Sequence, residues 1–225
     1  ITEWEEFTGR TEAVEAVEVR PRVSGHIQEV RFQSGQLVRK GDVLFVIDPR
    51  WYKAEFDRRQ AEYEQARVRL ENTERMAARS ARLLASKAIS SETADTSESQ
   101  FQEAKAGLLA AKSLLESARL DLEFTEGRAP IDGRASRALL TAGNYVSGIA
   151  GGASLLTKLV SVDPIYVYAD VDENSLLKFN ALADERKAGG YQAIPVELEL
   201  ADEEGFPHRG TVESFDNRLD PNTGT

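Results

Sequence analysis

The sequence contains no cysteine at any of its 225 positions. Without thiols the chain can form neither a disulfide framework nor a thiolate metal site, and its redox compartment stays open. Long apolar runs are absent as well, because no stretch approaches the roughly 18 residues that a membrane-spanning helix requires. The sequence therefore predicts neither a disulfide-stapled scaffold nor a membrane span.

Basic residues are fewer than acidic ones: the chain has 28 Lys and Arg and 38 Asp and Glu, which gives a net charge of -10. A general nucleic-acid binder shows a basic face, so we expect no nucleic-acid partner. The two histidines, His26 and His208, lie far apart in the chain and have no cluster of metal ligands around them. No nucleophile motif, phosphate loop or dinucleotide fingerprint is present. We therefore predict no enzymatic activity, no catalytic residues, no metal and no cofactor.

Two long helices are predicted within residues 49–125. Alternate steps of three and four residues connect apolar and small side chains, and this spacing of 3.5 is that of a coiled-coil seam. The predicted seam of the first helix is Phe56, Arg59, Tyr63, Ala66, Leu70, Thr73, Ala77, Ser80 and Leu84. The predicted seam of the second helix is Ala94, Ser97, Phe101, Ala104, Leu108, Ala111, Leu115, Ala118 and Leu122.

The break between these helices, at residues 86–91, is too short for anything but an antiparallel reversal. At 1.5 Å per residue, residues 51–85 make a rod roughly 50 Å long, which must project from a domain of this size. We expect Asp48 to be the N-cap of the first helix, with Pro49 at its first helical position. Ser90 or Ser91 is expected to start the second helix.

Short strands are predicted on both sides of the helices, in residues 17–48 and 126–163, and the two blocks repeat one pattern. The matching positions are Gly25, Gly35 and Val38 in the first block and Gly133, Gly143 and Val146 in the second. Two matching half-units are expected to pair as one domain. The helical insertion then leaves this domain from a single edge.

Residues 1–16 and 164–225 are expected to form a small β-barrel that is incomplete in this sequence. Alternating apolar side chains predict strands at 165–171, 196–200 and 211–215. Asp172 is expected to cap one helix that ends before Gly189. The fold class predicted from the whole chain is α+β, elongated and multidomain.

The first β block, Val19-x-Pro21-x-Val23-Ser24-Gly25 through Gly41-Asp42-x-Leu44 to Ile47-Asp48, resembles half of a biotinyl/lipoyl domain. In carrier proteins of that family the modified lysine lies on the hairpin directly after this strand. In this sequence Asp48-Pro49-Arg50-Trp51 occupies that place, and the helical insertion begins there. This departure from the carrier pattern counts against a carrier with a swinging lysine arm.

A lipoyl domain split by a helical hairpin and followed by Asp163-Pro164-Ile165-Tyr166-Val167 and a β-barrel resembles the periplasmic adaptors of tripartite efflux pumps. These are membrane fusion proteins of the AcrA/MexA type, which serve transporters of the resistance-nodulation-division (RND) class. The resemblance covers essentially the whole chain. It implies an antiparallel coiled-coil hairpin inserted in a split lipoyl (biotinyl-like) domain, plus a small β-barrel with one helix.

The same resemblance implies the partners and the location. The expected partners are an inner-membrane RND transporter, an outer-membrane channel protein and further copies of the chain in a ring, as a trimer or hexamer. The expected location is the periplasm, with attachment to the inner membrane in the full-length protein through an anchor that this sequence does not contain. Three alternatives stay open: an adaptor of an ATP-driven exporter or type I secretion system, a biotinyl/lipoyl carrier subunit, and a structural coiled-coil protein without a channel partner.

Arg79, Leu83 and Ser90 are the candidate site residues. In the family, the hairpin tip carries an Arg, a Leu four residues on and a Ser seven beyond that, and these three positions match in type and spacing. The resemblance implies that they meet the outer-membrane channel. Taken singly, Arg79 is typical of a solvated helix charge, Leu83 of a packing residue beside Leu84, and Ser90 of an N-cap. Only their joint spacing favours a binding role.

Overall fold

The computed structural model describes residues 4–149, 151–172, 175, 178 and 195–214. The chain divides into two compact units, one made of Ala13–Ile165 and the other of Ile1–Glu12 with Tyr166–Thr225. No helix in the described ranges is both long enough and apolar enough to span a bilayer.

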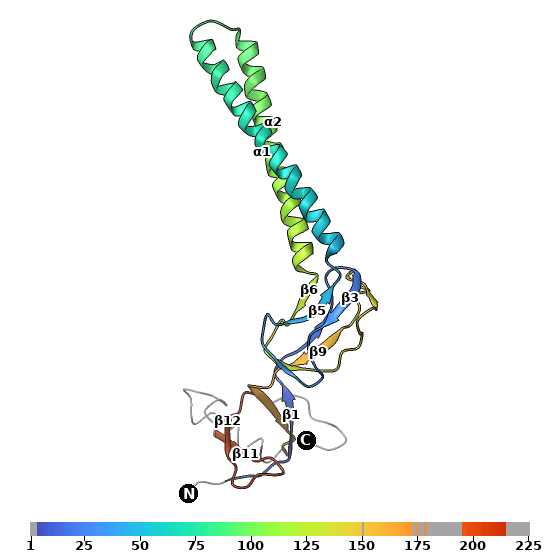
Figure 1. Ribbon diagram of the computed structural model, residues 1–225. Helices are drawn as coiled ribbons and strands as arrows, with labels where there is room; N and C mark the ends of the chain where they lie inside the picture. The colour runs from blue at the N-terminus through green and yellow to red at the C-terminus, as the bar shows by residue number, and fades with distance from the viewer. Residues whose placement is uncertain (1–3, 150, 173–174, 176–177, 179–194, 215–225) are drawn as a thin grey trace. The chain divides into compact units, whose positions relative to one another are not determined.

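Two helices, α1 (Arg50–Ala85) and α2 (Ser91–Glu123), lie side by side and dominate the larger unit (Figure 1). With 36 residues, α1 is about 54 Å long at 1.5 Å per residue. In α2, the nine predicted seam residues are the nine residues of the helix that are shielded from solvent. In α1 the predicted seam is shielded from Phe56 to Ser80, whereas Leu84 is exposed. The shielded part of the α1 seam thus ends at Ser80, more than one turn before the end of the helix at Ala85.

The start of α1 differs from the prediction by one residue. Its N-cap is Pro49 rather than Asp48, because the carbonyl of Pro49 accepts the first hydrogen bond of the helix, from the Lys53 N–H at 2.8 Å. The carboxylate of Asp48 accepts the Arg50 N–H at 3.1 Å and also binds the Arg50 guanidinium. The acid therefore accepts a free N–H of the first turn from the position before the N-cap.

Two four-stranded antiparallel sheets form the rest of the larger unit, and each contains two strands from either side of the helices. Their orders are β2-β9-β7-β4 and β6-β5-β3-β8. The strands before the helices are β2 (Ala16–Val19), β3 (Gly25–Val30), β4 (Leu37–Val38) and β5 (Val43–Ile47). The strands after them are β6 (Glu126–Arg128), β7 (Gly133–Ala135), β8 (Tyr145–Val146) and β9 (Thr157–Val160). The largest fully buried apolar side chains are Phe45, Ile27, Leu44, Ile47, Leu156, Leu159 and Val146.

The two β blocks pair with each other, as the repeat predicts, and the pairing is reciprocal. Gly25 of β3 lies opposite Val146 of β8, and the matching glycine, Gly133 of β7, lies opposite Val38 of β4. Exchanging the two blocks therefore reproduces the same strand pairs. The reciprocity extends to ion pairs, because Glu18–Arg20 in the first block recurs as Glu126–Arg128 in the second. Each block thus completes the sheets of the other.

The helices leave and re-enter the sheets at neighbouring strands. β5 leads into α1, α2 leads into β6, and β5 pairs with β6. The N–H of Ile47 donates to the carbonyl of Thr125 at 2.8 Å, which closes the base of the insertion. Across this base the Tyr52 hydroxyl donates to the Ser24 carbonyl at 2.7 Å. The insertion therefore leaves from one place, as predicted.

In the smaller unit, β1 (Gly9–Ala13) pairs with β10 (Ile165–Ala169), and β11 (Pro195–Leu198) pairs antiparallel with β12 (His208–Thr211). The strand predicted at 211–215 was placed too late. The turn before β12 sets the register of β12. In this turn the Glu199 carboxylate accepts the N–H of Gly205 at 2.7 Å, and His208 then lies opposite Leu198. The helix predicted after Asp172 lies largely outside the described residues.

Candidate functional site

The turn between α1 and α2 is built by backbone hydrogen bonds around one left-handed residue, Lys87 (φ 57°). The Lys87 N–H donates to the Leu84 carbonyl and the Ala88 N–H donates to the Leu83 carbonyl, each at 2.8 Å. This crossed pair of bonds is a Schellman ending, in which the left-handed position usually holds glycine. The tip is thus ordered by its own backbone, although a lysine occupies the strained position.

Ser90 begins α2 as the predicted N-cap. Its extended backbone (φ -78°, ψ 157°) lets the side-chain oxygen accept the Thr93 N–H at 3.2 Å, and its hydroxyl lies 2.9 Å from the Thr93 hydroxyl. An N-cap satisfies one of the free N–H groups at the start of a helix. The hydroxyl of Ser90 is therefore already in use within the chain.

Arg79 and Leu83 lie one helical turn apart on α1, whereas Ser90 lies beyond the reversal. Arg79 is exposed and has no ion pair or side-chain hydrogen bond within the described part of the chain. Leu83 is 39% exposed, which is high for an aliphatic side chain beside a helix seam. No hydrogen bond joins any two of the three side chains within that same part of the chain. The site offers a free cation and an aliphatic group, a combination suited to a partner surface with carboxylate and apolar groups.

A polar pair in the seam lies just below the tip and is not singled out by the sequence pattern. The hydroxyls of Ser80 and Ser97 lie 3.0 Å apart between the helices, and Ser97 also donates to the Thr93 carbonyl at 3.1 Å. Polar seam residues set the register of paired helices at some cost in stability. The signal in the sequence was one serine in each predicted seam, next to the break between the helices.

At the base of the two helices, Asp48 and Arg50 form an ion pair where the resemblance to carrier proteins would put a modified lysine. Arg50 binds both carboxylate oxygens of Asp48, at 2.9 and 3.0 Å from its Nε. Hydrogen bonds from the Arg50 side chain and backbone lower the pKa of Asp48 to about 2. The neighbouring Trp51 is largely exposed. In the described ranges, no group of three or more acidic or histidine side chains is placed to hold a metal ion.

Comparison with known proteins connects this architecture to one family. Residues 15–157 match the family model described as RND MFP, barrel-sandwich hybrid domain. The efflux pump periplasmic linker BepD of Brucella suis is 33% identical over 222 residues, which cover 98% of this chain and 56% of BepD. The multidrug resistance protein MexA of Pseudomonas aeruginosa is 32% identical over 222 residues, covering 98% and 54% of the two chains. The multidrug efflux pump subunit AcrA of Escherichia coli is 33% identical over 221 residues, covering 98% and 55%.

The chain spans about half the length of these curated relatives. Solved structures share the fold. A MacA–MexA chimera that contains the Pseudomonas aeruginosa MexA α-hairpin domain superposes with a TM-score of 0.58 at 24% identity, over 95% of this chain and 68% of the chimera. A membrane fusion protein from Streptococcus pneumoniae gives 0.57 at 16% identity, over 75% and 69% of the two chains. Because the family model covers more than half of the sequence, the chain belongs to the RND membrane fusion protein (MFP) family, with its barrel-sandwich hybrid domain at residues 15–157.

Proposed function

We propose that this protein is a non-enzymatic periplasmic adaptor that links an inner-membrane RND transporter to an outer-membrane channel for the export of drugs or other toxic compounds. One observation carries the proposal. Identity of about one third extends over 98% of the chain to BepD, named an efflux pump periplasmic linker, and to AcrA, named a multidrug efflux pump subunit. The proposed location is the periplasm, with attachment to the inner membrane in the full-length protein.

Each of three parts of the chain has its own proposed role. Residues 49–125 form an antiparallel coiled-coil hairpin that reaches the channel. Residues 17–48 and 126–163 are the halves of a lipoyl domain, which packs against other copies in a ring. Residues 1–16 and 164–225 belong to a β-barrel that faces the transporter. The interleaved sheets and the shielded helix seam support the first two assignments.

At the tip, Arg79, Leu83 and Ser90 are proposed to meet the channel. The free guanidinium of Arg79 is ready to pair with a carboxylate, and Leu83 adds exposed apolar surface beside it. Each such contact is small, so binding relies on several adaptors engaging one channel at once. Contacts that differ between the open and closed channel then shift the channel between these states.

The test is the Arg79→Asp substitution in the complete protein. We expect loss of efflux and a return to drug sensitivity, because the reversed charge repels the carboxylates that bind Arg79. The fold stays intact, since the side chain has no partner within the described part of the chain. Lys53→Asp is the matched control, because Lys53 is also exposed on α1 but lies near the base of the hairpin.

A photo-crosslinker at Leu83 supplies the second readout. It is expected to capture an outer-membrane channel in the parent protein and to lose that product in the Arg79→Asp variant. Unchanged drug susceptibility together with unchanged capture would refute the tip assignment. A second photo-crosslinker, placed in the β-barrel, tests the transporter. If it captures a component of an ATP-driven system, the protein is an adaptor of that class of exporter instead.

A further inference from the structure

A hollow of about 390 Å³ lies where β5 passes into α1, at the base of the two helices (Figure 1). Its walls come from the beginnings of β3 and α1 and from the residues just before them. The residues that line it are Ser24, Gly25, His26, Asp48, Arg50, Trp51 and Tyr52. The volume falls within the range of about 300–1,000 Å³ that small-molecule sites occupy. The hollow thus combines aromatic rings with one acid and one arginine at a size that suits a small ligand.

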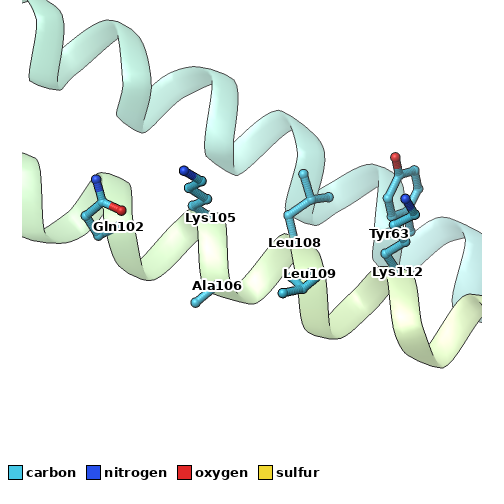
Figure 2. A pocket seen from close by; sticks show the side chains of 7 residues that line it. All are labelled: Tyr63, Gln102, Lys105, Ala106, Leu108, Leu109 and Lys112. Carbon is cyan, nitrogen blue, oxygen red and sulfur yellow. The ribbon is translucent and has the colours of Figure 1, made fainter.

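A second hollow, of about 480 Å³, lies on the flank of the helices and differs from the first in its side chains (Figure 2). Its lining residues are Tyr63, Gln102, Lys105, Ala106, Leu108, Leu109 and Lys112. Within the described part of the chain, only Gln102 among them makes a side-chain hydrogen bond, to Glu98 at 2.8 Å. The two lysines are unpaired there, and fixing such long side chains on a ligand costs conformational entropy. The hollow at the base of the helices is better prepared for a ligand, because contacts within the chain already hold its side chains.

Two of the aromatic rings at the base are fixed by their neighbours. Tyr52 is half-buried, and its hydroxyl donates to the Ser24 carbonyl at 2.7 Å. The ring of His26 packs edge-on against Tyr145, with the ring centroids 5.3 Å apart, and its Nδ1 lies 3.4 Å from the Gly143 carbonyl oxygen. These contacts hold both rings in one orientation before any ligand arrives, which lowers the entropy cost of binding.

Trp51 is the third ring, and it is turned toward solvent. Tryptophan is highly buried on average in folded proteins, but Trp51 is 69% exposed. Its ring stands perpendicular to that of Tyr52, with the centroids 5.2 Å apart. The indole N–H donates to no group within the described part of the chain. Trp51 therefore presents an aromatic face and a hydrogen-bond donor at the edge of the hollow.

The acid and the arginine of the hollow neutralise each other. Arg50 Nε lies 2.9 and 3.0 Å from the two carboxylate oxygens of Asp48. Among the described residues, Nη1 of Arg50 has no acceptor. Apart from His26, the lining therefore carries no net charge. The ion pair offers a free donor beside carboxylate acceptors, an arrangement that suits two adjacent hydroxyls of a neutral ligand.

We propose that this hollow binds a neutral saccharide, with one pyranose ring stacked on Trp51 and neighbouring hydroxyls bonded to Asp48 and Arg50. A pyranose has C–H bonds on its ring faces and hydroxyls around its rim, so it matches an aromatic face beside paired donors and acceptors. A purely apolar ligand would cover the ion pair without replacing its hydrogen bonds to water, which costs free energy. The site goes beyond the proposed adaptor role and does not depend on it.

The test measures the binding of two neutral oligosaccharides, cellotetraose and N-acetylated chitotetraose, to the purified complete protein. Saturation-transfer NMR detects ligands with a Kd of about 1 mM when they are supplied at about 10 mM. At least one probe is expected to bind, with the strongest transfer at its ring C–H protons. In a Trp4→Phe background Trp51 is the one remaining tryptophan of the sequence, and its fluorescence emission is expected to shift on binding.

Variants then locate the site. Trp51→Ala is expected to weaken binding at least tenfold, because the stacking face is gone. Since this side chain is exposed, the fold remains intact, which circular dichroism checks. Arg50→Gln is expected to weaken binding several-fold while Trp51 stays in place, because the charged donors are lost. The matched control is Trp4→Phe, which should bind as the parent does, since Trp4 is 60% exposed but belongs to the smaller unit.

Two further compounds check the chemical class of the ligand. Sorbitol has hydroxyls but no ring face, and a sulfated chondroitin tetrasaccharide has ring faces but a strong negative charge, so neither should compete with the bound probe. Absence of binding by both probes, equal affinity of Trp51→Ala and the parent, or competition by either compound at equal concentration would overturn the proposal. Loss of channel capture at Leu83 with saccharide binding intact would refute only the adaptor proposal.

Discussion

Asp48 is the residue at which the chain turns from sheet to helix. Its carboxylate holds both the backbone and the guanidinium of Arg50. These bonds favour the ionised form and lower the pKa of Asp48 to about 2. The pKa of Asp48 in the folded protein lies below its value of about 3.9 in the unfolded chain. The ionised carboxylate therefore stabilises the folded protein at pH values above about 3.9, and this stabilisation is lost as the pH falls through 2.

Arg50→Gln is therefore expected to raise the pKa of Asp48 toward its ordinary value. Carbon-detected NMR titration of the Asp48 carboxyl in both proteins measures this change directly. The parent protein should lose stability relative to the variant between about pH 4 and pH 2, because only the parent gains from the ionised carboxylate. Arg50→Lys serves as a control that keeps the charge without the fork of donors. If the pKa of Asp48 is the same in Arg50→Gln as in the parent protein, Arg50 is not the cause of the lowered pKa.

At the scale of elements, two glycines differ in the space around them: Gly133 lies in a sheet against a neighbouring strand, and Gly107 lies on an open face of a helix. A Cβ on Gly133 in β7 would stand 2.3 Å from the carbonyl oxygen of Val160 in β9. This neighbour is backbone and cannot move aside without breaking the sheet. A Cβ on Gly107 in α2 would meet no atom within 4 Å. The same substitution should therefore have opposite effects at the two positions.

Gly133→Ala is expected to destabilise the protein by about 3 kcal/mol or more, at the upper end of ordinary point substitutions. Gly107→Ala is expected to stabilise it by up to about 1 kcal/mol, since alanine favours a helix interior. Urea unfolding of both variants beside the parent measures the two changes. A Gly133→Ala variant with parental stability would show that β7 and β9 are not as close as described.

The hairpin itself illustrates what local pattern can predict. The spacing of 3.5 identified the shielded residues of α2 without exception, because a helix surface repeats within a few residues. The exposed Leu84 and the shifted N-cap at Pro49 were not predicted. Both depend on how the helix ends meet neighbouring segments, which a periodic pattern does not record.

At the scale of the larger unit, the two sheets do not depend on the helices for their core. The fully buried apolar side chains all come from the two β blocks, and β5 and β6 are already adjacent, with Val46 opposite Glu126. Replacing residues 50–123 with a short turn is expected to leave a cooperatively folding β protein. Near-ultraviolet circular dichroism and thermal unfolding check this result.

In the same variant, far-ultraviolet spectra should lose most of their helical signal. The proposed adaptor function also predicts loss of efflux, because the part that is proposed to reach a channel is gone. Restoring only the lower part of the hairpin, residues 50–66 and 111–123, is the control that keeps the base contacts. A variant that unfolds without cooperativity would show that the hairpin contributes to the core after all.

The sequence by itself determined the helical pair, the doubled β pattern, the Ser90 cap and the family. Each of these depends on residue types at short, regular spacings. Only the tertiary structure decided the reciprocal pairing of Gly25 with Val146 and Gly133 with Val38, the register of β12 and the contact of Ser80 with Ser97. These features join residues that are distant along the chain, and their registers follow from strand pairing and the Ser80–Ser97 contact, which no local pattern specifies.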